Sequence, residues 1–157
     1  MPSSASIYEN KVRVRACGIC IQNGQILMIN HKNLHPKDFW APPGGGIRFG
    51  ETAEECLIRE FLEETHLNIR IVRHLFIYDF IQPPLHAIEL FFQVEQIGGA
   101  LQTGKDPESG HLDQIISEAK FLDFKEINEM APETLHGVFG HLTDSSEILR
   151  VRGYIKP

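Results

Sequence analysis

The sequence predicts a single domain, residues 1–157, of the mixed class, α/β (α+β). Strand-like apolar runs flank one long helical segment, short helix candidates follow, and strands and helices do not alternate regularly. A length of 157 residues is sufficient for one domain with its own core. The composition, with 42% apolar and 23% charged residues, is typical of a globular protein and excludes a wholly disordered or coiled-coil chain.

The expected elements follow in this order. Asn23-Gly24, between strand-like residues 12–21 and 25–30, favours a hairpin. Residues 31–43 predict a loop. Thr52, with Glu55 three residues later, predicts a capped helix that ends near Thr65. The remaining predictions are strands at 69–81, 86–97 and 119–124, a polar loop at 98–114, short helices at 123–130 and 132–140, and an ambiguous segment at 144–151.

Charge and cysteine content narrow the function classes. The net charge of −6 is not typical of proteins that bind nucleic acids or anionic membranes, so we expect neither as a partner. No apolar run reaches the length of a membrane span, and no signal peptide is visible. Cys17 and Cys20 lie three apart on a predicted strand and so point to opposite faces. With Cys56 in the helix, we expect structural thiols in a cytoplasmic protein rather than a disulfide or a zinc site.

The predicted helix carries an unusual cluster of acidic residues. Six glutamates lie between residues 51 and 64, where Arg59 is the only basic residue. On a helical wheel, Glu60, Glu63 and Glu64 share an arc of roughly 100°. The face predicted to pack on the core adjoins this arc and consists of Ala53, Leu57, Ile58, Phe61 and Leu62.

A solvated charged face is the simpler interpretation of such a cluster. It suffices for Glu54 and Glu55, because the first turn of a helix favours anions. It does not suffice for Glu60 and Glu64, which form a like-charge pair four residues apart near the helix end that disfavours negative charge. Because Mg²⁺ prefers oxygen ligands, the cluster predicts a divalent-cation site, and the preceding glycines 44–46 allow a ligand to approach the main chain.

The segment from Gly45 to Leu67 resembles the motif of the Nudix hydrolase family. That motif reads Gly, five residues, Glu, seven residues, Arg-Glu, an aliphatic residue, any residue, Glu-Glu, any residue, Gly and an aliphatic residue. Here Gly45 is followed after five residues by Glu51, and seven more lead to Arg59-Glu60-Phe61-Leu62-Glu63-Glu64-Thr65-His66-Leu67. Phe61 replaces an aliphatic residue. His66 replaces the closing glycine, a position that commonly needs a positive φ.

The resemblance implies a Nudix-like α/β/α sandwich with a mixed β-sheet, and hydrolysis of a nucleoside diphosphate linked to another moiety. It implies that Glu60, Glu63 and Glu64, with the main chain of Gly45, hold Mg²⁺ or Mn²⁺, while Arg59 orients a carboxylate. Small-molecule nucleotides are the implied substrates: ADP-ribose, nucleotide sugars or nucleoside triphosphates. A homodimer is common in the family. The alternative is a Nudix-fold binding or regulatory module without catalysis, which the intact Arg59 and glutamates disfavour.

Four residues are candidates for substrate contacts. Phe39 or Trp40 could stack on a nucleobase, or could anchor the core or a loop. Arg48 could reach a phosphate, with a solvated side chain as the alternative. Glu51 is a candidate for the metal or the substrate.

The general base in this family is a glutamate of the motif or one from a distant loop. Glu118 is a distal candidate, for which a solvent-facing position is the simpler interpretation. Arg13 and Arg15 share one strand face and could contact phosphate or a partner subunit, although a solvent face is again simpler. Pro83, sixteen residues after Leu67, resembles the ADP-ribose-type branch of the family, with a hairpin turn as the plain alternative.

Overall fold

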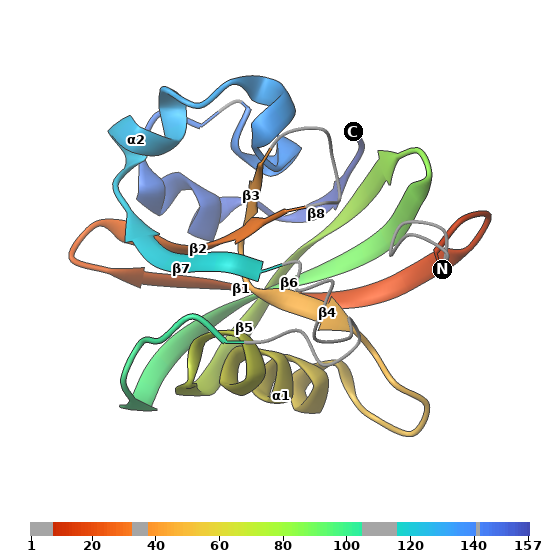
Figure 1. Ribbon diagram of the computed structural model, residues 1–157, viewed down its shortest axis with the longest axis horizontal. Coiled ribbons are helices and arrows are strands. Elements are labelled where there is room, and N and C mark those ends of the chain that lie inside the picture. The colour runs from red at the N-terminus through yellow and green to blue at the C-terminus, as the bar shows by residue number, and fades with distance from the viewer. Residues whose placement is uncertain (1–7, 33–37, 105–115, 141) are drawn as a thin grey trace.

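A mixed β-sheet forms the centre of the molecule in the computed structural model, which describes residues 8–32, 38–104, 116–140 and 142–157 (Figure 1). The strand order is β3-β2-β1-β6-β5-β8, with β4 paired to β1 and β7 paired to β2. The pairs β1–β6 and β5–β8 are parallel and the others antiparallel, which confirms the predicted mixed sheet. The strands are β1 (Val12–Gln22), β2 (Gln25–His31), β3 (Phe39–Ala41), β4 (Gly44–Gly46), β5 (Leu67–Gln82), β6 (Leu85–Gly99), β7 (Ile116–Leu122) and β8 (Gly153–Ile155).

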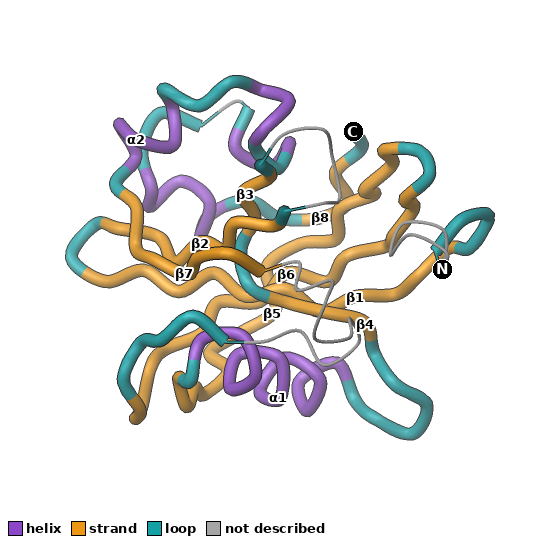
Figure 2. Tube along the Cα trace, viewed as in Figure 1, coloured by secondary structure: helices purple, strands orange, loops and turns teal. Residues whose placement is uncertain are grey.

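Helices lie on both sides of this sheet. Figure 2 shows α1 on one side, and α2 with the short 3₁₀ helices on the other, so the layers follow the expected α/β/α order. These helices are α1 (Ala53–Thr65), α2 (Phe124–Asn128), η2 (Pro132–Thr134), η3 (Gly137–Phe139) and η4 (Ser145–Arg150). Among the described residues, no helix combines the length and apolar character needed to cross a membrane.

Local sequence signals explain the first hairpin and both ends of α1. Asn23 and Gly24 adopt φ values of 51° and 77°, as expected for the turn that matches the twist of a hairpin. Thr52 accepts a hydrogen bond from the Glu55 amide at 3.1 Å, and the Glu55 carboxylate accepts one from the Thr52 amide at 2.8 Å. His66 ends the helix with φ 62°, so the predicted positive φ at this position is confirmed.

Apolar side chains pack on both faces of the sheet. Leu57 and Phe61 of α1 pack with Ala16 and Cys20 on one face. Cys17 belongs to the second cluster, together with residues of β5, β6 and the C-terminal helices. All three cysteines are buried free thiols, and Cys17 and Cys20 lie on opposite faces as predicted.

Several short elements differ from the sequence prediction. The loop predicted at 31–43 contains β3, and the strand predicted at 119–124 ends at Leu122 because Asp123 caps α2. The helix predicted at 132–140 is two 3₁₀ turns, the ambiguous segment contains η4, and β8 was not predicted. Three-residue strands depend on a partner strand rather than on local pattern, which explains their omission. In the predicted loop at 98–114, β6 continues to Gly99, and residues 105–115 lie outside the described residues.

The buried face of α1 also differs from the prediction. Ile58 and Leu62, expected in the core, are 44% and 49% exposed. Glu60 and Glu64 are buried instead, at 7% and 4% exposure. The wheel assigns the inner face by apolarity alone, whereas part of the inner face of α1 carries carboxylates that face the protein.

Candidate functional site

The centre of the candidate site is the contact between Glu60 on α1 and the glycine strand β4. A methyl group added at Gly45 would lie 2.5 Å from Oε2 of Glu60, and closer still to Cδ and Oε1. Only glycine therefore allows the Glu60 carboxylate to occupy its place against the main chain. The glycine run that the sequence placed before the helix is thus a strand of the sheet, paired with β1.

Arg59 gathers three of the motif carboxylates. Its Nε and Nη2 donate to the two oxygens of Glu51 at 2.7 and 3.0 Å. Its Nη1 donates to Glu60 at 2.7 Å and to Glu63 at 3.1 Å. Its Nη2 also donates to the carbonyl of Gly46 at 3.3 Å. The planar guanidinium fork therefore fixes carboxylates from the loop and the helix relative to β4.

Glu63 and Glu64 lie where a neighbouring loop meets the end of α1. The amide of Gly104 donates to the carbonyl of Glu64 at 2.7 Å, and the amide of Gln102 donates to that of Thr65 at 3.0 Å. A side chain at Gly104 would collide with the carbonyl of Glu63. The segment 101–104 therefore runs directly beside the glutamate pair.

Charge at this site favours a bound cation. Burial raises the pKa of Glu60 above its ordinary value, while Arg59 opposes this effect. The hydrogen bonds from Arg59 lower the pKa of Glu51 to about 2. When ionised, Glu51, Glu60 and Glu63 carry three negative charges around the guanidinium of Arg59, and the charge of Arg15 also acts on Glu60. Burial raises the pKa of the nearby Cys56 to about 12, so this thiol is neutral near pH 7 and does not alter the balance.

The donor set fits a hard divalent cation in chemistry but is not assembled as a complete cage. Glu60 and Glu64 carry carboxylates one helical turn apart on α1, and the Gly45 carbonyl on β4 accepts a hydrogen bond from the Cys56 thiol at 3.5 Å. Mg²⁺ commonly takes one or two carboxylates and completes its shell with water and substrate phosphates. Within the described residues, no three His, Cys, Asp or Glu side chains converge on one ion position. Arg59 Nη1 binds both Glu60 and Glu63, so the meeting of these two carboxylates with Glu64 at one ion stays a prediction.

The two aromatic candidates lie in different environments. Phe39 is 4% exposed and packs edge-on against Phe80 and beside His136, so its ring is part of the core and has no face open to a base. Trp40 is partly buried, and the ammonium of Lys120 lies 5.2 Å from its ring centre. Of the two, only Trp40 retains a surface that a nucleobase could use.

The polar candidates are also placed by the structure. Arg48 is exposed, and its amide donates to Glu51 at 2.9 Å, so Glu51 closes the turn before α1 as well as binding Arg59. Glu118 has a 47% exposed side chain that pairs with Lys120 at 3.4 Å, as the solvent-facing interpretation predicts. Arg15 is not solvent-facing: its side chain is 18% exposed and pairs with the buried Glu89.

Sequence reasoning missed Glu89 and His136, which are 1% and 2% exposed. Glu89 lies two residues from Ala87 and from Phe91, both buried on the same strand. Because strand residues two apart share a face, this alternation indicates a buried carboxylate that needs a partner. His136 lies just before the short helix η3, at its N-cap, and has no comparable sequence signal.

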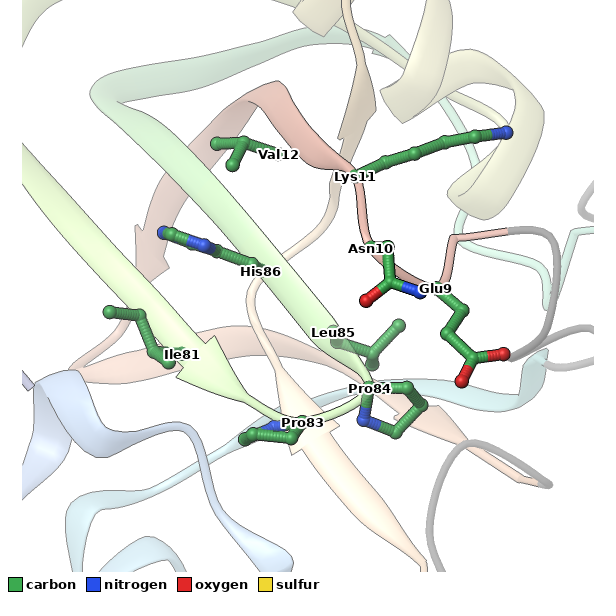
Figure 3. A pocket seen from close by; sticks show the side chains of 9 residues that line it. All are labelled: Glu9, Asn10, Lys11, Val12, Ile81, Pro83, Pro84, Leu85 and His86. Atoms are coloured by element: carbon green, nitrogen blue, oxygen red, sulfur yellow. The ribbon is translucent and has the colours of Figure 1, made fainter.

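A hollow of about 540 Å³ lies at the hairpin that joins β5 and β6 (Figure 3). It is lined by residues 9–12, by Ile81 and by residues 83–86, none of which belongs to the motif. Figure 3 shows that Lys11 and His86 extend in opposite directions, so their polar groups do not converge on one ligand position. Pro83 and Pro84 form the hairpin turn, as the plain interpretation predicts.

Comparisons with known proteins show what the whole chain is similar to. The family model for the NUDIX domain matches residues 11–140. The chain is 34% identical over 116 residues to "ADP-ribose pyrophosphatase" of Methanocaldococcus jannaschii, across 73% of this chain and 63% of that protein. It is 22% identical over 114 residues to "NAD-capped RNA hydrolase NudC" of Pectobacterium carotovorum, across 73% of this chain and 40% of that protein. The chain thus spans less than two thirds of the length of either relative.

A solved structure supports the fold. "MutT NUDIX hydrolase from Burkholderia pseudomallei" superposes with a TM-score of 0.63 at 18% identity, covering 78% of this chain and 88% of that one. At this identity the likeness shows the architecture alone.

Proposed function

This chain belongs to the NUDIX domain family, and on that premise we propose that it hydrolyses the pyrophosphate bond of a nucleoside diphosphate linked to another moiety. The observation that carries the proposal is the contact of Arg59 with Glu51, Glu60 and Glu63 beside the glycine strand. This arrangement gathers acidic oxygens from the loop and from α1 beside the main chain of β4.

We assign the roles as follows. Glu60, Glu63 and Glu64, with the carbonyl of Gly45, are proposed to hold Mg²⁺ or Mn²⁺. When bound, such an ion supplies charge that polarises a phosphoryl group and lowers the pKa of water. Arg59 orients Glu60 and Glu63 through its Nη1 and keeps their oxygens from turning to solvent. The general base is proposed to be one of the motif glutamates.

ADP-ribose is the first substrate to test, because a relative that is 34% identical is named for it. Nucleotide sugars and nucleoside triphosphates complete the panel. An NAD-capped RNA is included because a second relative is named for that substrate, and its cleavage would contradict our expectation of no nucleic-acid partner. We propose Trp40 and Arg48 as substrate contacts, and segment 101–104 as part of the specificity region because it runs beside Glu63 and Glu64. The three buried free thiols agree with a cytoplasmic location.

The test is Mg²⁺-dependent turnover of this panel, with products identified by mass. We expect Glu64→Gln to lose at least about a hundredfold in kcat, which corresponds to roughly 2.7 kcal/mol of transition-state stabilisation. Glu54→Gln is the matched control, since Glu54 is an exposed glutamate in the first turn of the same helix. Binding of a nucleotide without turnover by the wild-type protein would favour the regulatory module instead. Equal kcat in both variants would refute the assigned role of Glu64.

A further inference from the structure

A buried charged network lies on the face of the sheet opposite α1. Glu89 on β6 accepts hydrogen bonds from Arg15 Nη1 at 2.5 Å and from the Cys17 thiol at 3.4 Å, and lies 2.6 Å from His136 Nε2. Nδ1 of His136 accepts from the Val138 amide at 3.1 Å, so the ring proton is on Nε2, which donates to Glu89. Burial alone raises the pKa of Glu89, but His136, Arg15 and Cys17 together lower it to about 2.

Arg15 connects this network to the candidate site. While Nη1 binds Glu89, Nη2 donates to the carbonyl of Gly44 at 3.2 Å. Gly44 is the first residue of β4 and precedes Gly45, the residue against which the Glu60 carboxylate lies. The guanidinium therefore joins a fixed buried anion to the strand that supports Glu60.

A strand of three glycines has no side chains with which to hold its own position. It is also costly to order, because glycine loses more backbone freedom on folding than other residues. Neighbouring side chains supply the missing contacts at each carbonyl. Arg15 binds that of Gly44, Cys56 donates to that of Gly45 at 3.5 Å, and Arg59 binds that of Gly46 at 3.3 Å. Cys56 and Arg59 belong to α1, whereas Arg15 reaches the strand from β1.

We propose that Arg15 is a positioning residue of the candidate active site, and that Glu89 and His136 hold its guanidinium in place. By holding Gly44, it keeps the main chain of Gly45 in register with the Glu60 carboxylate. The catalytic consequence rests on the proposed function, whereas the effect on β4 does not.

Arg15→Lys separates positioning from charge balance. The lysine ammonium can pair with Glu89 but has no planar fork that reaches Glu89 and Gly44 together. We expect amide hydrogen exchange of residues 44–47, including the Ile47 amide that donates to Val14, to become at least tenfold faster. Exchange in α2 should be unchanged. Arg70→Lys is the matched control, because Arg70 is an exposed arginine paired with Glu95 across the same sheet.

Kinetics supply the second measurement. In Arg15→Lys, we expect kcat to fall at least tenfold and the substrate KM to change less than threefold. The reason is that the displaced carboxylate of Glu60 acts on the reacting centre rather than on substrate binding. We expect Arg70→Lys to match the wild type in both exchange and kinetics. His136→Leu removes the donor to Glu89 and should reproduce the fast exchange, whereas His136→Gln, which keeps an N–H, should restore slower exchange.

The outcomes are distinct. Exchange of residues 44–47 in Arg15→Lys at the wild-type rate would overturn the proposal, as would equal acceleration throughout the chain, which indicates general destabilisation. If no substrate is turned over but the local acceleration is present, the positioning role stands and the proposed hydrolysis fails.

Discussion

Replacement of Gly45 by alanine tests the contact on which the candidate site depends. The added methyl would lie 2.5 Å from Oε2 of Glu60, whereas carbon and oxygen atoms in contact are separated by about 3.3 Å or more. The obstructed atoms belong to the end of a flexible side chain, so the carboxylate can retreat by about 1 Å while the fold remains. Such a displacement of a reacting group can reduce a rate by about a hundredfold.

We therefore expect Gly45→Ala to lose about a hundredfold in kcat, equivalent to roughly 2.7 kcal/mol, with little change in thermal unfolding. The assay is steady-state hydrolysis of the best substrate at saturating Mg²⁺, beside calorimetric unfolding. Gly98→Ala is the matched control, since a methyl there meets only the Asn68 side chain, at 3.6 Å or more. A Gly45→Ala variant with wild-type kcat would refute the view that this contact places Glu60. A variant that fails to fold would show instead that β4 cannot accommodate the change.

Three further predictions concern the surrounding residues. Arg59→Lys should lower kcat by tenfold or more in steady-state assays with the fold intact, because an ammonium cannot serve three carboxylates as the guanidinium does; an unchanged kcat would contradict this. The folded protein lowers the pKa of Glu89 from 4.5 to about 2, so ionised Glu89 stabilises the folded state. This stabilisation is present above pH 4.5 and is lost as the pH falls toward 2. In urea unfolding, the free energy of unfolding of the wild type should fall by about 2 kcal/mol more than that of Glu89→Gln by about pH 3. If the two proteins show the same dependence on pH, the prediction is wrong. His66→Gly should raise the free energy of unfolding by about 0.5–1 kcal/mol by relieving a positive φ, and a lower urea midpoint would contradict this.

The sequence predicted the elements whose signals are local. The hairpin at Asn23-Gly24 and the capping box at Thr52 follow from short-range chemistry, and the left-handed residue at His66 follows from its place at the closing glycine of the motif; the structure contains all three. The two longest strands were also predicted within a few residues of their ends. These features need no knowledge of a distant partner.

What the sequence did not predict depends on residues far apart in the chain. A helical wheel assigns Ile58 and Leu62 to the core. In the structure, Glu60 and Glu64 occupy part of the inner face of α1, and Ile58 and Leu62 are exposed. Arg15 resembles a solvated strand residue until Glu89, 74 positions later, is placed beside it by the parallel pairing of β1 and β6. Phe39 was a stacking candidate, but the pairing of β3 with β2 directs its side chain into the core.

The glycine strand explains why the motif alone does not specify the geometry of the site. A strand without side chains leaves room for the Glu60 carboxylate on one face, and it is held by its backbone pairing with β1 and by side chains of neighbouring elements. Arg59, within the motif, holds one end of this strand through the carbonyl of Gly46. Arg15, outside the motif, holds the other end through Gly44, and its own position depends on Glu89 and His136. A chain with an intact motif but without this second support should therefore bind the same groups in a less fixed arrangement.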